Sequence, residues 1–227
     1  MRAKQSGFTL IEIAIVLVII GLLLGGVLKG QELITNARVR NIIAQQDGIK
    51  VAYFGFQDRY RGIAGDYTPA LAAANIPGMN PCPAAAVCGG NGNGLIEAAG
   101  NENIAAWMQL TRAGFVTGNY DGVPGGGPVE TATNSPTNPY GGFMQVIFDA
   151  VYQGNGGVSR NNVKTGGGIP ATLLAEVDRK IDDGNGNTGE FRFSTFGLGA
   201  APPACVDAAG VWNINAGLGN CGGASLF

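Results

Sequence analysis

An apolar run near the start of the chain, Phe8–Leu28, constrains the fold more than any other feature. It is 21 residues long and contains one charged residue, Glu12. A helix of that length spans about 30 Å, the thickness of a bilayer's hydrocarbon core. Two cations, Arg2 and Lys4, precede the run, so we expect the short leader on the cytoplasmic side and the rest of the chain outside. The sequence therefore predicts one membrane-spanning helix over residues 8–28.

The apolar run is expected to remain in the mature protein rather than to be removed as part of a cleaved secretory signal. A secretory signal normally ends its apolar stretch with a small-residue site such as Ala-x-Ala. The segment 25–29 offers no clear version of that site, and the basic leader is short.

Glu12 needs an explanation, because a carboxylate inside a membrane-length segment is costly. One alternative is a protonated side chain, or one that extends to the nearby interface. The other is a side chain with a function and a partner of opposite charge.

The stretch SGFTLIE, residues 6–12, resembles the processing site of type IV prepilins and of the related pseudopilins of type II secretion. The matching features are a short basic leader, Gly7 before the cut, Phe8 after it, Glu12 at the fifth mature position and an apolar helix behind. The resemblance implies that a membrane-embedded aspartyl peptidase cuts after Gly7 and N-methylates Phe8. It also implies that Glu12 pairs with the α-amino group of a neighbouring subunit and sets the register of assembly.

The same resemblance implies an α+β class, the pilin fold. Residues 1–7 would be a leader peptide that is removed, and 8–28 the transmembrane and filament-core part of a long helix. Residues 29–61 would be its amphipathic half, packed on a globular head, 62–227, with an antiparallel sheet and long loops. The composition agrees, because Gly supplies 39 of 227 residues against a usual share of about 7%, while apolar content stays at 45%.

Helical character is predicted to continue beyond the membrane segment, because apolar and aromatic side chains recur with heptad spacing. Gly48 and Gly55 weaken such a helix by roughly 1 kcal/mol each relative to Ala. The resemblance assigns the membrane half of the helix to packing between subunits and the outer half to packing on the protein's own head. The stripe consists of Ile42, Gln46, Ile49, Tyr53, Phe56 and Tyr60, with Leu33, Ile34 and Ala37 upstream.

Four further elements are predicted in the head. Two are helices, Glu102–Gly114 and Pro170–Asp183. Their apolar residues have helical spacing, and a Gly follows or forms the C-terminal end of each helix. Two are strands, Phe143–Tyr152 and Glu190–Thr195, because they are rich in aromatic and β-branched residues or alternate in polarity. The stretches between them are rich in Gly, Asn and Pro and are predicted to be mostly loops.

Four cysteines fit an oxidising compartment, and they permit three connectivities. Their clustering at two distant places favours Cys82–Cys88 together with Cys205–Cys221. A zinc site ranks far lower, because the chain has no CxxC and no His. The C-terminal pair also resembles the disulfide-bounded loop that many pilins carry near their C-terminus.

An acidic cluster, Asp178, Asp182 and Asp183, is a candidate calcium site, because hard cations take carboxylate, amide and carbonyl oxygens. The string around it also resembles one in the heads of prepilin-type proteins, and some pseudopilins bind calcium in a head loop. Against this, Arg179 and Lys180 lie within the cluster and the EF-hand pattern is absent. The preferred alternative is a helix end followed by a turn with Gly184 in a left-handed conformation. A second loop, 91–97, is a weaker candidate, since Glu97 is its one charged residue.

Removal of the leader would change the formal net charge from −2 to −4, because Arg2 and Lys4 leave with it and no acid does. A mildly acidic chain without a basic block has no nucleic-acid footprint. The chain also lacks His and carries no phosphate-binding loop, nucleophile elbow or dinucleotide fingerprint. We therefore expect a protein that is not an enzyme and has no cofactor, the candidate calcium site aside.

The function that the resemblance implies is that of a structural subunit of a type IV pilus. The expected partners are further pilin subunits and the prepilin peptidase, with a membrane platform protein and an assembly ATPase acting indirectly. The subunit would wait in the bacterial inner membrane with its head in the periplasm and end in an extracellular filament. One alternative is a pseudopilin of a type II secretion system, and another is a membrane-tethered binding head that never polymerises.

Overall fold

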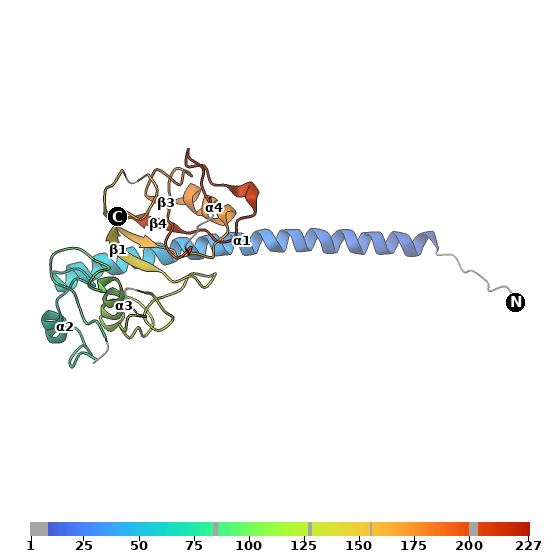
Figure 1. The fold of residues 1–227 in the computed structure, drawn as a ribbon. Coiled ribbons are helices and arrows are strands. Elements are labelled where there is room, and N and C mark those ends of the chain that lie inside the picture. The colour runs from blue at the N-terminus through green and yellow to red at the C-terminus, as the bar shows by residue number, and fades with distance from the viewer. Residues whose placement is uncertain (1–8, 84–85, 127–128, 155, 200–203) are drawn as a thin grey trace. The chain divides into compact units, whose positions relative to one another are not determined.

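The computed structural model describes the chain except residues 1–8, 84–85, 127–128, 155 and 200–203 (Figure 1). The chain is divided into two compact units, residues 1–38 and 39–227. One uninterrupted helix, α1 (Leu10–Tyr60), contributes 51 residues and supplies part of each unit. With the four-stranded antiparallel sheet described below, this confirms the α+β, pilin-like arrangement expected from the sequence.

The first unit consists of the N-terminal part of α1. Its apolar side chains are exposed in the single chain, and Leu10 is 92% exposed. Within the part of the chain that the structure describes, α1 is the one helix whose length and composition would allow it to cross a membrane. Leu33 and Ile34 are also exposed, so the expected upstream extension of the buried stripe is wrong. Burial on α1 begins at Val39.

In the second unit, the outer part of α1 is the central support of the head. Its buried residues recur at intervals of three and four, as the heptad pattern predicted. They contribute to two hydrophobic clusters, one around Phe56 and Trp107 and one around Leu174 and Trp212. The buried residues are Val39, Ile42, Gln46, Ile49, Ala52, Tyr53 and Phe56.

The sheet has the strand order β1-β2-β4-β3, and every pair is antiparallel (Figure 1). β1 (Gln145–Asp149) and β2 (Arg160–Lys164) pair in the register Gln145↔Lys164. β4 (Gly223–Leu226) lies between β2 and β3 (Phe191–Phe193). The last strand of the chain therefore joins the two parts of the sheet.

Three shorter helices and one 3-10 turn complete the head. α2 (Pro69–Asn75) has Thr68 as its N-cap, whose hydroxyl accepts from the Leu71 N–H at 3.5 Å. α3 (Glu102–Arg112) and α4 (Ala171–Ile181) lie within the two predicted helices, and η1 (Ile214–Ala216) follows late in the chain.

The predicted strands are present but shorter, since β1 covers Gln145–Asp149 and β3 covers Phe191–Phe193. Three elements, α2, β2 and β4, were not predicted from the sequence pattern. β2 reads as polar, with Asn162 and Lys164 at buried positions, and β4 is a short run of small residues that ends in Leu226.

Candidate functional site

The N-terminus of α1 is closed by a reciprocal pair of hydrogen bonds between Thr9 and Glu12. The backbone N–H and the hydroxyl of Thr9 both donate to Glu12 Oε2 at 2.7 Å. In return, the Glu12 N–H donates to Thr9 Oγ1 at 3.3 Å. This is a capping box, in which a Thr and a Glu three residues on satisfy each other's backbone N–H groups.

The capping box gives Glu12 a local partner that the sequence analysis overlooked, although the spacing Thr-x-x-Glu signals it. Unsatisfied N–H groups at a helix start are costly in lipid, so the cap lowers the cost of placing this end in a membrane. It also holds the carboxylate at Thr9, the first residue that the structure describes. The expected processing residues Gly7 and Phe8 themselves lie outside the described residues.

Two disulfides join the four cysteines in the pairing that the clustering favoured. Cys82 is bonded to Cys88 with a Cα–Cα distance of 6.0 Å. Cys205 is bonded to Cys221 with a Cα–Cα distance of 5.9 Å, and both of these residues are buried. The second bond closes the segment that carries Trp212 and η1.

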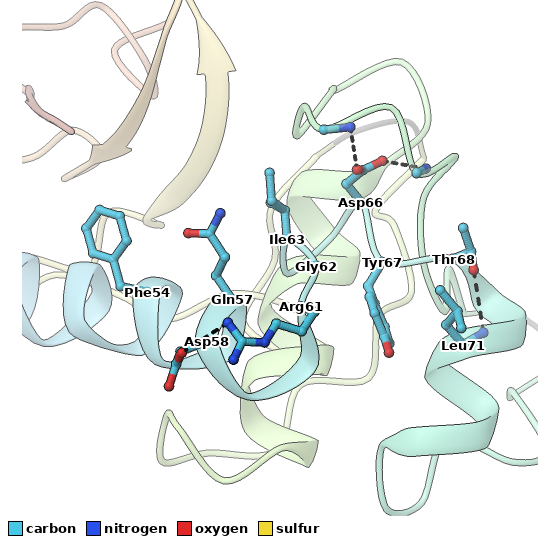
Figure 2. Close-up of a pocket in the computed structure, with 12 residues that line it drawn as sticks. Phe54, Gln57, Asp58, Arg61, Gly62, Ile63, Asp66, Tyr67, Thr68 and Leu71 are labelled. Atoms are coloured by element: carbon cyan, nitrogen blue, oxygen red, sulfur yellow. Dashed lines mark hydrogen bonds and ion pairs between the residues drawn. The ribbon is translucent and has the colours of Figure 1, made fainter.

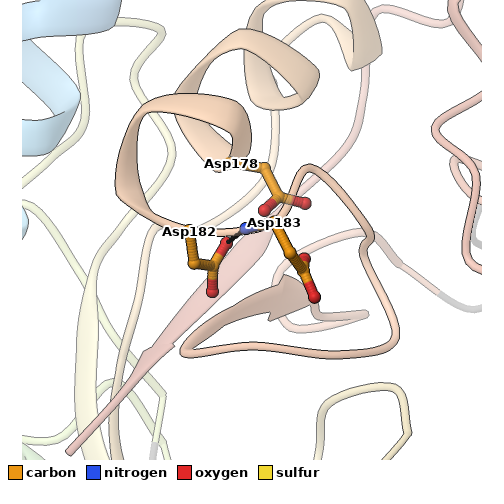
Figure 3. A group of neighbouring side chains, drawn as sticks. All are labelled: Asp178, Asp182 and Asp183. Carbon is orange, nitrogen blue, oxygen red and sulfur yellow. Dashed lines mark hydrogen bonds between the residues drawn. The ribbon is translucent and has the colours of Figure 1, made fainter.

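The structure brings Asp178, Asp182 and Asp183 together at the C-terminal end of α4 (Figure 3). Asp178 is fully buried, and its two oxygens accept from the Gly184 N–H at 3.1 Å and from Trp212 Nε1–H at 2.5 Å. Gly184 has φ +75°, the left-handed conformation expected at this helix end.

The other two carboxylates hold the turn that follows. Asp182 Oδ1 accepts from the Asp183 N–H at 2.8 Å, and Oδ2 accepts from the N–H groups of Glu190 and Phe191. The two oxygens of Asp183 accept from the Asn185 N–H and from the Thr188 hydroxyl. Every oxygen of the three carboxylates thus accepts a hydrogen bond from the protein.

This geometry favours the structural alternative over a cation site. Burial raises the pKa of Asp178 to about 8, and the hydrogen bond that it shares with Asp182 adds to the rise. A cation at this cluster would have to compete with the hydrogen-bond donors already in place on each carboxylate. Through their hydrogen bonds, the three residues connect the end of α4 to the start of β3 and to the segment closed by the Cys205–Cys221 disulfide.

Two further buried carboxylates, Asp66 and Glu102, organise the loop 91–97. Asp66 accepts from the N–H groups of Gly92 at 2.7 Å, Asn93 at 3.1 Å and Gly94 at 2.7 Å. Glu102 accepts from the N–H groups of Asn91 and Glu97, and burial raises its pKa. The sequence offers one signal for this arrangement, a Gly-Asn-Gly-Asn-Gly run whose N–H groups need acceptors.

The same loop turns amide nitrogens toward its one carboxylate. The side-chain NH2 groups of Asn91 and Asn93 donate to Glu97 Oε2 at 3.2 and 2.9 Å. The amide oxygens of these residues accept backbone N–H groups instead. As with the Asp178 cluster, the contacts favour a structural loop.

A polar network crosses the buried end of β1 and β2. Lys164 is 1% exposed, forms an ion pair with Asp149 and donates to Gln145 Oε1 at 3.2 Å. Glu130 accepts from Gln145 Nε2 at 2.6 Å and from Asn103 Nδ2 at 2.7 Å. Burial lowers the pKa of Lys164 and raises that of Glu130. The network explains how polar side chains occupy core positions of the sheet.

A family model described as the prokaryotic N-terminal methylation motif matches residues 2–28. No curated protein and no solved structure matches the chain. The family match covers the leader and the apolar part of α1 that includes Glu12, and it agrees with the resemblance found in the residues. The apolar helix, the α+β head and the two disulfides fit the same kind of protein. Residues 2–28 are thus a type IV prepilin-type signal, and the chain has the features of a pilin- or pseudopilin-like precursor.

Proposed function

We propose that this chain is a structural subunit of a type IV pilus, cut after Gly7, N-methylated at Phe8 and polymerised through its N-terminal helix. The observation that carries the proposal is an exposed, almost wholly apolar helix surface within a prepilin-type signal. Apolar burial contributes about 1.5–3 kcal/mol for each large aliphatic side chain, so this surface needs lipid or protein around it. A filament subunit meets both in turn, first the membrane and then its neighbours.

Glu12 is assigned the role of setting the position of one subunit against the next. Cleavage would create an α-amino cation at Phe8, and N-methylation would keep its charge. Opposite charges attract strongly at low dielectric, so the carboxylate would be the partner of a neighbour's amine. In the precursor the capping box with Thr9 occupies the same carboxylate, and pairing with the amine competes with the cap.

The remaining parts of the proposal concern location and partners. The subunit is held in the inner membrane by the segment 8–28, is processed by prepilin peptidase and is then extracted into an extracellular filament. Extraction from lipid needs an external motor, which in this family is a cytoplasmic ATPase acting through a membrane platform protein. The head contributes the filament surface and is not assigned any catalysis.

Mass spectrometry of filaments sheared from cells tests the processing step. The expected material is a chain that begins at N-methylated Phe8, with both disulfides intact. A chain that begins at Met1, or the absence of the protein from sheared filaments, would contradict the proposal.

Two substitutions separate assembly from anchoring. Glu12→Ala should abolish filaments while the protein remains folded and in the membrane fraction. Thr9→Ala removes the cap's hydroxyl and keeps the carboxylate, so filaments should still form. Normal filaments from Glu12→Ala would indicate a tethered, non-polymerising head, and equal loss in both variants would indicate that Glu12 acts only through the cap.

The same signal is shared by pseudopilins, and no contact among the described residues of the head favours that alternative. A secretion assay in the deletion strain distinguishes the two. A pilus subunit should leave type II secretion unchanged, whereas a pseudopilin should be required for it.

A further inference from the structure

An open pocket of about 680 Å³ lies where the last turns of α1 meet the segment 62–71 and the glycines of the loop 91–97 (Figure 2). Its size falls in the range of about 300–1,000 Å³ that small-molecule sites occupy. The proposed filament role makes no use of it. The pocket lies entirely within the head unit.

The apolar lining of the pocket includes one nearly buried side chain, Tyr67, and two half-exposed ones, Phe54 and Leu71. Phe54 is 51% exposed and Leu71 48% exposed, although both are large and apolar. Tyr67 is nearly buried, and its hydroxyl accepts from Asn75 Nδ2 at 2.9 Å. The site therefore offers an aromatic face to solvent at its rim and a fixed aromatic ring inside.

The polar part of the rim comes from the end of α1. Gln57 and Asp58 from the last turn of α1 and Arg61 directly after it all line the pocket, and Figure 2 shows the Arg61 side chain extended toward Asp58. Asp58 and Arg61 form an ion pair at 3.5 Å, and both side chains are more than 80% exposed. The rim thus combines planar acceptors and donors with no net charge of its own.

The glycine loop does not make this an anion site. The N–H groups of Gly92 and Gly94 donate to Asp66 and are not directed at the pocket. Together with the Asn93 N–H, these two donors occupy the Asp66 carboxylate, so a cation would have to compete with three hydrogen bonds there. Neither does the wall suit an extended peptide, because the pocket is lined by helix ends and loops rather than by an open strand edge.

Arg61 is placed at the rim in a strained backbone conformation. Its φ is +55°, and its N–H donates to the Gln57 carbonyl at 2.9 Å, so it occupies the left-handed position that ends a helix. Glycine is the usual residue there, because a Cβ is disfavoured in that conformation. A strained residue with an exposed side chain points to a use for that side chain.

We propose that this pocket binds a short neutral saccharide. The exposed ring of Phe54 would stack on the apolar face of one sugar ring, and Tyr67 and Leu71, at the opposite end of the pocket, would contact another ring of the same saccharide (Figure 2). Asp58 would accept from adjacent hydroxyls, Arg61 would donate to them, and Gln57 can do both. This role requires only the folded head and stands whether or not the chain polymerises.

The test is saccharide binding by the full chain in phosphatidylcholine nanodiscs, which avoid detergents with sugar headgroups. The probes are the neutral trisaccharides of glucose, galactose, mannose and N-acetylglucosamine, followed by calorimetry and saturation-transfer NMR. At least one should bind, and Phe54→Ala should weaken it by about tenfold or more, as removal of an aromatic anchor does.

Arg61→Gly is the decisive variant. It should weaken binding by a similar factor while raising the melting temperature, because Gly relieves the backbone strain. Loss of binding therefore cannot be attributed to unfolding. The matched control is Val51→Ala, which changes an exposed side chain of the same helix that does not line the pocket and should bind like the parent.

Several outcomes would overturn the proposal. One is that none of the four trisaccharides binds, and another is that binding survives both Phe54→Ala and Arg61→Gly. A third is that only charged sugars bind and that salt abolishes their binding, which would make this an ionic site. A fourth is that a peptide or a second copy of the chain occupies the pocket and excludes the sugars.

Discussion

Trp212 donates a hydrogen bond from its indole N–H to Asp178 Oδ2 at 2.5 Å, and so ties the segment closed by the Cys205–Cys221 disulfide to the end of α4. Both side chains are buried, and the other Asp178 oxygen accepts from the Gly184 N–H. A buried carboxyl group that keeps its proton is more stable in the folded chain than a charged one.

This relationship predicts that the stability of the head decreases as the pH rises from about 4 to about 8. The pKa of Asp178 is raised to about 8 in the folded state from 3.8 in the unfolded chain. Between these values the folded state holds a proton that the unfolded state has lost, so the free energy of unfolding falls as pH rises. Thermal unfolding monitored by tryptophan fluorescence from pH 5 to pH 9 measures the decrease.

Asp178→Asn is the matched variant for that measurement. Asn is neutral at every pH and retains an oxygen that can accept from Trp212, but its NH2 group takes the place of the oxygen that accepts from the Gly184 N–H. The variant should therefore be less stable than the parent at pH 5 and lose less stability than the parent over the same pH range. Parallel curves for the two proteins would show that Asp178 does not titrate in this range.

Asp66 should be among the most sensitive polar residues of the head. It is 4% exposed and accepts three backbone N–H bonds from the loop 91–97. Asp66→Ala leaves the Gly94 N–H without its acceptor, whereas Gly92 keeps the Asp66 carbonyl and Asn93 keeps Asn91 Oδ1, so the free energy of unfolding should fall by about 1–3 kcal/mol. Hydrogen exchange at Gly94 should accelerate most, because its N–H group loses its acceptor.

The control for this prediction is Asp58→Ala. Its side chain is 84% exposed and its partner is Arg61 at the surface, so its loss should change stability by less than about 1 kcal/mol. Equal effects of the two substitutions would contradict the role assigned to Asp66.

The helices α1, α3 and α4 were predictable because each of them shows its buried face in sequence, whereas α2 was not predicted. The heptad stripe of α1 reappears as a buried stripe that begins at Val39, and α3 and α4 follow apolar residues at helical spacing. The exposure of Leu33 and Ile34 could not be read from that pattern, because spacing gives the face of a helix and not the point where a partner covers it.

The sheet was only half predictable, because two strands contradict the usual pattern. β2 places Asn162 and Lys164 at buried positions, which becomes acceptable only through contacts with Asp149 from β1. β4 begins at Gly223, where a Cβ would lie 2.3 Å from the ring of Phe191. Both features depend on side chains far away in sequence, as do the bonds of Asp66. Thr9, by contrast, was available from local spacing alone.

Lys164 should tolerate replacement poorly unless its partner is replaced as well. Lys164→Met leaves Asp149 without its cation in a mostly buried setting and should lower the free energy of unfolding by about 3 kcal/mol. The double variant with Asp149→Asn should lose less than the sum of the two single losses, because the two side chains interact. Urea unfolding of the four proteins gives the coupling energy, and strict additivity would contradict the pairing.

The exposed ion pair between Arg179 and Glu176 provides the reference for that cycle. Arg179→Met should change stability by less than about 1 kcal/mol, since surface pairs contribute little. A loss as large as that of Lys164→Met would mean that burial is not the reason for the sensitivity of Lys164.

The two disulfides should differ in what their removal costs. By restricting the unfolded chain, the Cys205–Cys221 disulfide should stabilise the fold by about 3 kcal/mol. The Cys82–Cys88 disulfide closes a shorter loop and should contribute about 2 kcal/mol. Cys221 also forms two backbone bonds with Ile169, at 2.8 and 3.2 Å, whereas Cys82 is exposed. Paired Cys→Ser variants of each bond, compared by urea unfolding, should therefore show the larger loss for the C-terminal pair. If removal of the Cys82–Cys88 bond destabilised the head as much or more, the loop that it closes would carry more of the fold than these contacts indicate.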